Sequence, residues 1–139
     1  MTNANDPISD LARAAQDQLA QRPELLTLLA TVSQDFAASP AMEATLANAT
    51  KQIMAYMETE AVSIFLLDDS GEHLTCLACA GPVSIEGLTL DATQGIVGRT
   101  VSEDRVQMVR DTAADRSFTG AVDNLTGFRT RSILCAPLK

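Results

Sequence analysis

The first half of the chain carries hydrophobic residues at the three- and four-residue steps of amphipathic helices. A thin stripe rich in alanine and glutamine predicts a helix over residues 7–21, and a wider leucine-rich stripe predicts a second helix over 23–36. A third stripe predicts a helix over 40–58 that is capped by Ser39 and faces a core. This part of the chain is therefore expected to be helical.

The hydrophobic pattern changes at Glu60, where a short apolar run replaces the helical spacing. Residues 61–67 are followed by the turn sequence DDSG at 68–71 and by a second apolar segment over 73–80. This order predicts a β-hairpin with a loop of about four or five residues. Because both faces of 61–67 are largely apolar, we expect that strand to lie inside the sheet, covered on both sides.

The sequence after residue 82 predicts loops that are interrupted by one short helix and two short strands. Thr93 is expected to cap the helix, which has only moderate helical character because it contains two glycines. The helix is expected over 93–102, the strands over 106–109 and 132–138, and the loops around Leu88 and Leu90 and over 111–127.

Composition and charge narrow the classes of partner. The 139 residues are 46% hydrophobic, which is enough for one globular domain. Ten Lys plus Arg against eighteen Asp plus Glu give a net charge of −8, which repels nucleic-acid backbones and anionic membranes. One Tyr, four Phe and no Trp leave no aromatic platform for single strands, and no apolar run approaches the ~20 residues that span a bilayer. We therefore expect no nucleic-acid partner and no membrane partner.

The residues with reactive side chains form no recognisable catalytic or metal cluster. Cys76 and Cys79 have the spacing of zinc and redox motifs, but side chains three residues apart in a strand point to opposite faces. His73 is the single histidine and is expected to be exposed beside the hairpin turn. With Cys135 the cysteines number three, too few for a framework of bridges, which fits a reducing cytoplasm. We therefore expect a cytoplasmic protein without enzyme activity of its own.

Four sequence segments, in this order, resemble a known family. They are VSIFLLD at 62–68, QGIVG at 94–98, VRDTAADRSF at 109–118 and VDNLTGFRTRSILCAP at 122–137, after three helices. The order resembles that of a GAF domain, and is most similar to the GAF domains of cyclic-nucleotide phosphodiesterases and bacterial adenylyl cyclases.

The resemblance implies an α+β fold with an antiparallel sheet, helices packed on one face and a ligand pocket on the other. Residues 23–139 would form the GAF domain, and 1–22 a tail followed by a linker or dimerisation helix. The last strands and the C-terminal helix of the fold are expected to be lacking. Their absence would leave open edges on the strands at 61–67 and 132–138, which favours self-association.

The resemblance also assigns a ligand site. The residues that match the pocket of the cyclic-nucleotide subgroup are Ser63, Ile96, Val97, Asp123, Thr126 and Thr130. Hydroxyls and a carboxylate suit a purine edge and a cyclic phosphate, while backbone N–H groups at Ile96 and Val97 avoid the need for a full cation there. The ligand that the resemblance implies is a small molecule such as cyclic AMP or cyclic GMP, and we expect no other cofactor.

By this resemblance the chain is a regulatory, small-molecule-sensing domain of a bacterial-type signalling protein, controlling a separate output domain. The alternative is a dimerisation or coupling module without a small-molecule ligand, in which residues 8–36 supply the contact between two copies. A homodimer is expected in either case.

Overall fold

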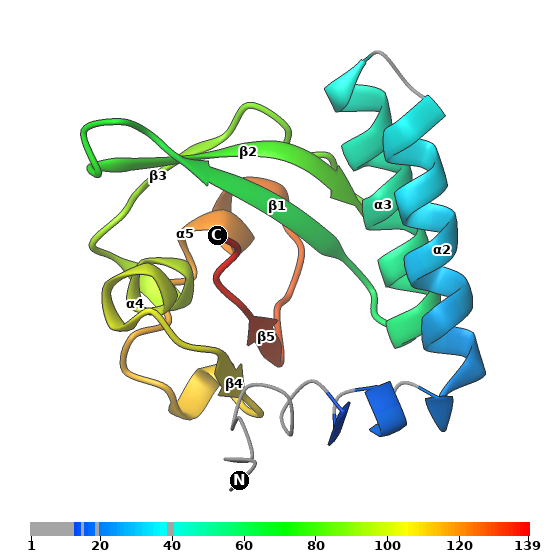
Figure 1. Cartoon of the computed structure of the whole chain (residues 1–139). Helices are drawn as coiled ribbons and strands as arrows, with labels where there is room; N and C mark the ends of the chain where they lie inside the picture. Colours follow the sequence, from blue (N-terminus) through cyan, green and yellow to red (C-terminus); the bar gives the residue numbers. More distant parts are fainter. Residues whose placement is uncertain (1–12, 15, 19, 39–40) are drawn as a thin grey trace, which may run out of the picture. The chain divides into compact units, whose positions relative to one another are not determined.

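The computed structural model describes residues 13–14, 16–18, 20–38 and 41–139 (Figure 1). The chain forms two compact units, Met1–Thr59 and Glu60–Lys139. Of the first helix expected over 7–21, the described residues up to Ala20 are helical, and its start lies outside the described residues.

The first unit contains α2 (Pro23–Ala38) and α3 (Met42–Met57), which pack against each other. Both helices are confirmed, although α3 begins at Met42 with Ala41 as its N-cap; Ser39, the expected cap, lies outside the described residues. Gln52 Nε2 donates a hydrogen bond of 3.0 Å to Asp35 Oδ2, which links the two helices.

The hydrophobic stripe of α3 is buried only in part. Ala49 is buried, whereas Met42 and Met57 at the two ends of the helix are exposed. The prediction that this whole stripe faces a core was therefore too broad, because helical spacing marks a face but not the length that is covered.

The second unit contains a three-stranded antiparallel sheet in the order β1-β2-β3, made of β1 (Val62–Leu67), β2 (His73–Ala80) and β3 (Thr89–Asp91). The hairpin is confirmed, and its register shifts once, between Ile64 and Phe65. β3 is a strand where a loop was expected. Its three residues are too few to show the alternation by which strands are recognised.

β1 lies at the edge of this sheet, so the expectation of a strand covered on both sides is wrong. Leu66 is 56% exposed, and Ser63 and Leu67 are exposed as well. β2 is the central strand, and its alternate residues from Leu74 to Ala80 are buried. An apolar run indicates that a strand is hydrophobic, but it does not show whether another strand pairs with each of its two edges.

The remainder of the second unit begins with α4 (Gly95–Glu103), which starts after Gln94 rather than at Thr93. A Cβ on Gly98 would lie 2.7 Å from the carbonyl oxygen of Ala92, so glycine is required where α4 crosses the preceding loop. The other elements are β4 (Gln107–Val109), the 3₁₀ helix η1 (Thr112–Ala114), α5 (Ala121–Thr126) and β5 (Ile133–Cys135). α5 was not predicted, because turn-forming residues dominate its surroundings.

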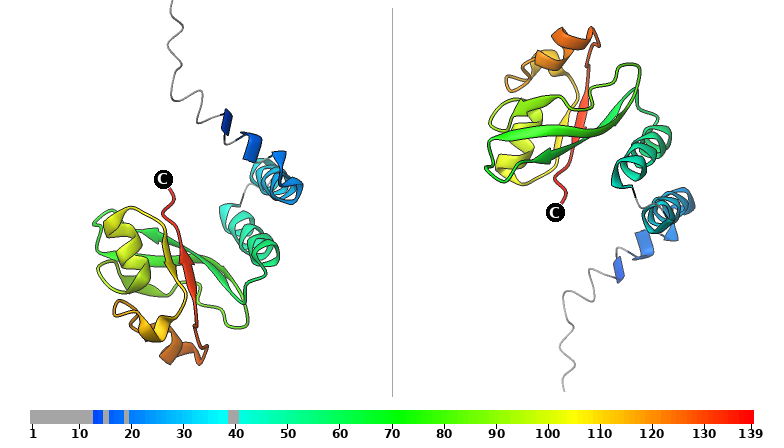
Figure 2. Two further views of the ribbon diagram at one scale, coloured as in Figure 1. Left: turned by 90° about the horizontal axis from the view of Figure 1, so that it is seen from below. Right: turned by 90° about the horizontal axis from the view of Figure 1, so that it is seen from above.

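β4 and β5 form a separate antiparallel pair in which Met108 lies opposite Leu134 (Figure 2). One face of the pair carries Gln107 and Val109, which are buried, and the other carries Met108 and Leu134, which are 66% and 53% exposed. Within the described residues, β1 and β5 each have an unpaired edge, as the resemblance implied. No described helix is long and apolar enough to cross a membrane.

Asp68 organises the turn between β1 and β2. Its Oδ1 accepts hydrogen bonds from the backbone N–H groups of Glu72 (3.0 Å) and His73 (3.2 Å) and from the Ser70 hydroxyl (2.9 Å). Desolvation raises the pKa of this carboxyl, but these hydrogen bonds outweigh it and lower the pKa from 3.8 to about 2. The charged form of Asp68 therefore stabilises the folded hairpin.

We predict that Asp68→Asn lowers the free energy of unfolding at pH 6 and that the gap to wild type narrows with acid. Because the folded pKa lies below the unfolded one, the contribution of Asp68 is complete above about pH 4 and is lost as pH falls from 3.8 toward 2. Urea denaturation between pH 6 and pH 3 measures the gap. Asp69→Asn, in the same turn but without a side-chain hydrogen bond, is the control, and a gap that does not depend on pH contradicts the prediction.

Candidate functional site on the β4–β5 connection

Residues 110–132 connect β4 to β5 and form the longest stretch of the second unit outside its two sheets (Figure 2). Binding residues are found disproportionately on connecting segments that a rigid scaffold positions. This connection contains η1 and α5, and side-chain hydrogen bonds hold it in place at three points. It contains three of the six predicted site residues.

Thr112 closes the base of the connection. Its backbone N–H donates to the carbonyl oxygen of Arg131 (2.9 Å), and its hydroxyl donates to that of Thr130 (2.7 Å). The residue is 5% exposed, so these bonds do not compete with water. Asp111 caps η1 by accepting the N–H of Ala113 at 3.0 Å. The two ends of the connection are thereby held beside each other.

Asp123 holds α5 to the residues that return to β5. Its Oδ2 accepts the backbone N–H of Thr130 at 2.7 Å, and its Oδ1 accepts the Thr130 hydroxyl at 2.6 Å. Thr126, on the same helix, donates its hydroxyl to the Val122 carbonyl (2.9 Å) and accepts the Phe128 N–H (3.1 Å). The structure thus bonds Asp123 to Thr130, whereas the Thr126 hydroxyl bonds to Val122 and Phe128 instead.

Arg99 attaches the first half of the connection to α4. Its two terminal nitrogens donate to the two carboxylate oxygens of Asp115 at 3.2 and 3.1 Å, and one of them also donates to the Ser117 hydroxyl at 3.1 Å. The two charged side chains are only 26% and 19% exposed. The backbone N–H of Ser117 and the Arg99 guanidinium lower the pKa of Asp115, so this carboxyl stays charged.

The start of α4 lies beside the residue that precedes α5. A Cβ on Gly95 would be 4.0 Å from the Thr119 hydroxyl, and Thr119 in turn accepts the N–H of Ala121. Gln94, the N-cap of α4, makes no side-chain cap, and the backbone N–H groups of residues 95–97 have no acceptor among the described residues. Uncapped N–H groups at a helix start bind anions.

The other three predicted site residues are placed differently. The side chain of Ile96 is 3% exposed, so this residue can offer a ligand only its backbone. Val97 is half-buried next to it, and Ser63 is exposed on the edge strand β1. Within the second unit, no hydrogen bond joins Ser63, Ile96 or Val97 to Asp123 or Thr130. The six predicted site residues therefore do not form one hydrogen-bonded cluster: three lie on the β4–β5 connection, two at the start of α4 and one on β1.

Three residues that shape this region were not assigned from the sequence: Thr112, Arg99 and Asp115. Thr112 and Asp115 stand in the segment 109–118 that carries the family resemblance, which was the available signal. For Arg99 there was none, because its partner lies sixteen residues away on a different element.

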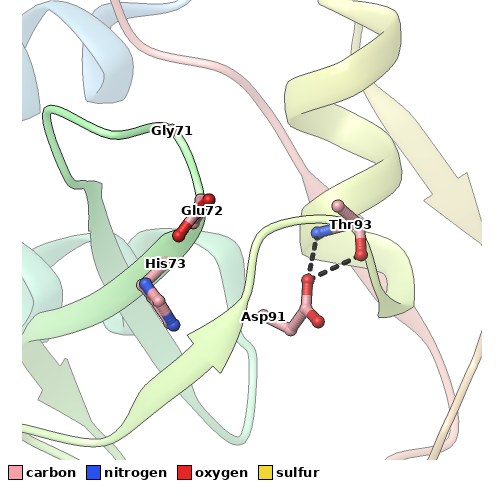
Figure 3. Close-up of a pocket in the computed structure, with 5 residues that line it drawn as sticks. All are labelled: Gly71, Glu72, His73, Asp91 and Thr93. Carbon is pink, nitrogen blue, oxygen red and sulfur yellow. Dashed lines mark hydrogen bonds between the residues drawn. The ribbon is translucent and has the colours of Figure 1, made fainter.

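The other chemical groups form no second candidate site. Cys76 is buried, which raises its pKa to about 12, and the nearby Cys79 thiol raises it as well. The register shift leaves Leu77 as an extra residue between the two cysteines, so the expectation that their side chains point to opposite faces is wrong. Cys79 also accepts the Ile85 N–H. His73 is exposed and contacts Asp68 at 3.2 Å. It lines an open depression of about 310 Å³ together with Asp91, whose carboxylate is bonded to Thr93 (Figure 3). Among the described residues no three His, Cys, Asp or Glu side chains gather to hold a metal.

The chain is similar to several characterised proteins. It is 26% identical over 93 residues to the dual 3′,5′-cyclic-AMP and -GMP phosphodiesterase 11A of Takifugu rubripes, a match that covers 60% of this chain and 10% of that enzyme. The chain therefore spans about a tenth of the length of this relative.

Among solved structures, the GAF domain of an Acinetobacter phosphoenolpyruvate-protein phosphotransferase superposes with a TM-score of 0.70 at 21% identity, covering 83% of this chain and 69% of that one. The free methionine-R-sulfoxide reductase of Neisseria meningitidis, solved with its substrate, superposes with a TM-score of 0.66 at 19% identity, covering 81% and 63%.

At these identities the two structures show the shared α+β fold and nothing of the ligand. The model of the GAF domain family matches residues 41–139, which include both sheets and the β4–β5 connection. The domain boundary at residue 23 stays a prediction. The chain belongs to the GAF domain family.

Proposed function

We propose that this chain is a cytoplasmic regulatory domain that binds a cyclic nucleotide, cyclic AMP or cyclic GMP, between the start of α4 and the β4–β5 connection, and controls a separate output domain. The observation that carries the proposal is the set of three uncapped backbone N–H groups at residues 95–97, next to Thr119 and α5. They would take the cyclic phosphate.

A helix start suits this chain better than a lysine or arginine would. The net charge of −8 repels an anion at long range, but the partial positive charge of a helix start acts within a few ångströms. Neutral N–H donors bind a singly charged cyclic phosphate without the desolvation cost of a full cation.

The polar side chains of α5 would read the base and the sugar. Both oxygens of Asp123 already accept hydrogen bonds from Thr130, but a carboxylate has about four lone-pair sites and retains room for a ligand donor. The Thr126 hydroxyl donates within its helix and keeps one free acceptor site. The similarity to a phosphodiesterase named for cyclic AMP and cyclic GMP supports the ligand class.

A regulatory role is favoured over a catalytic one. One structural relative is a reductase, yet a buried thiol with a pKa of about 12 stays protonated at neutral pH and is a poor nucleophile. The carboxylates of the connection are committed to hydrogen bonds that fix its shape.

A second candidate function is a dimerisation or coupling module without a small-molecule ligand. On α2, the side chains of Leu26, Leu29 and Phe36 are 44%, 47% and 51% exposed, and with Ser33 they recur at three- and four-residue steps. This stripe carries no charged residue, so a second copy that packs on it brings no like charges into direct contact there. We propose that a second copy of this chain covers it, in an isologous dimer.

The ligand proposal predicts that cyclic AMP or cyclic GMP binds the 139-residue chain with measurable heat in calorimetry. The same nucleotide should also raise the melting temperature, since a ligand present at 100 times its Kd adds about 2.7 kcal/mol to the stability. AMP, which has no cyclic phosphate, is the matched control. No heat from either cyclic nucleotide contradicts the ligand class.

Asp123 is predicted to contribute to both stability and binding. Asp123→Ala removes two hydrogen-bond acceptors and should lower the free energy of unfolding by about 1–3 kcal/mol. Well below the melting temperature, it should also weaken nucleotide binding, whereas Asn124→Ala, exposed on the same helix, should change neither. Lower stability with unchanged affinity would restrict Asp123 to a structural role.

The dimer proposal predicts a mass of twice 14.8 kDa by light scattering at micromolar concentration. Leu29→Glu places a charge in the apolar stripe of both copies and should give the monomer mass. Gln34→Glu adds the same charge on another face of α2 and should leave the dimer intact. A monomeric wild type would show that no second copy covers this stripe.

A further inference from the structure

The two walls of the proposed ligand site belong to different elements that need a fixed separation. One wall is the start of α4, and the other is the segment that runs through Thr119 into α5. Of the α4 side chains, Arg99 is the one that hydrogen-bonds to the β4–β5 connection, all of whose residues are described. The spacing of the two walls therefore depends on this residue more than on any other polar contact.

The bonding of Arg99 is directional. A guanidinium that donates through both terminal nitrogens to both oxygens of one carboxylate fixes an orientation as well as a distance. Asp115 is fixed in turn, since its Oδ1 accepts the Ser117 N–H at 2.8 Å and its carbonyl accepts the Phe118 N–H at 3.2 Å. Thr119 is the residue after Phe118, and α5 begins at Ala121, so the constraint reaches the second wall.

This ion pair differs from the exposed ones of the second unit. In the pair between Arg105 and Glu103 the side chains are 71% and 38% exposed, against 26% and 19% for Arg99 and Asp115. Water and salt screen the exposed pair, whereas the enclosed pair keeps its strength and resists rearrangement. The Nε of Arg99 is buried and has no hydrogen-bond partner. The Arg99 side chain is therefore held by the hydrogen bonds of its two terminal nitrogens alone.

We propose that Arg99 is a positioning residue: through Asp115 it latches the segment 115–121 to α4, and so fixes the position of the uncapped N–H groups of residues 95–97 relative to the residues around Thr119. This inference rests on the proposed function for its ligand arm and on geometry for the latch. By linkage, a ligand that bridges the two walls tightens the latch, and opening the latch weakens the ligand by the same factor.

The latch is tested first without ligand, by native-state hydrogen exchange of the amides at residues 117–121. Arg99→Ala and Asp115→Asn should each speed this exchange by about tenfold or more, while exchange in β2 stays as in wild type. The double variant should be no worse than either single one, because both remove the same interaction. Arg105→Ala, which breaks an exposed pair at the end of the same helix, is the control.

The second arm measures affinity for cyclic AMP and cyclic GMP in the same variants. Arg99→Ala should lose about tenfold in affinity, and Arg99→Lys should recover only part of it, because an ammonium cannot make the two-point contact. Faster exchange with unchanged affinity, or unchanged exchange, overturns the positioning role. If wild type binds neither nucleotide while exchange responds as expected, the proposed function fails and the latch stands.

Discussion

The shape of the candidate site depends on the pair of hydrogen bonds by which Thr112 joins the two ends of the β4–β5 connection. The sheet fixes little of this connection's conformation, because β4 and β5, the strands at its two ends, are only three residues long. Because the N–H and the hydroxyl of a buried threonine bind two consecutive carbonyls, of Thr130 and Arg131, both the separation and the register of the ends are fixed. Everything between them can then be positioned by few further contacts.

Most polar side chains in the region already form hydrogen bonds within the protein. A ligand could therefore bond only to the donors and lone pairs that remain unpaired. Asp123, Thr126 and Asp115 all accept hydrogen bonds from neighbouring backbone groups, so each has a structural role before it meets a ligand. The N–H groups at the start of α4 have no such role, and they are the unsatisfied donors of the site. In the proposed site, these N–H groups would bind a negatively charged group, and the remaining lone pairs of α5 would contact the rest of the ligand.

The sequence predicted the long periodic elements and the hairpin, because helical spacing and turn residues act over neighbours in the chain. It missed β3 and α5, which are three and six residues long and offer no full period to read. It placed β1 inside the sheet, since an apolar run is compatible with either position. Asp123 and Thr130 could be named from the family resemblance, but Arg99 could not, because ten basic and eighteen acidic residues allow many pairings and only the fold selects one.

The ligand and dimer proposals rest on different units and on different physics, so either can fail alone. The stripe on α2 depends on apolar area without charge, whereas the site depends on hydrogen-bond donors and enclosed ion pairs. Glu60 is the first residue of the second unit, directly after the helical unit in the chain. Arg131, adjacent to Thr130, contacts Glu60 at 3.1 Å, but these side chains are 73% and 65% exposed, and such pairs contribute at most about 1 kcal/mol. A ligand bound at the proposed site would therefore change the environment of Glu60 mainly by moving the backbone of Thr130 and Arg131 that Thr112 holds, and only weakly through this surface pair.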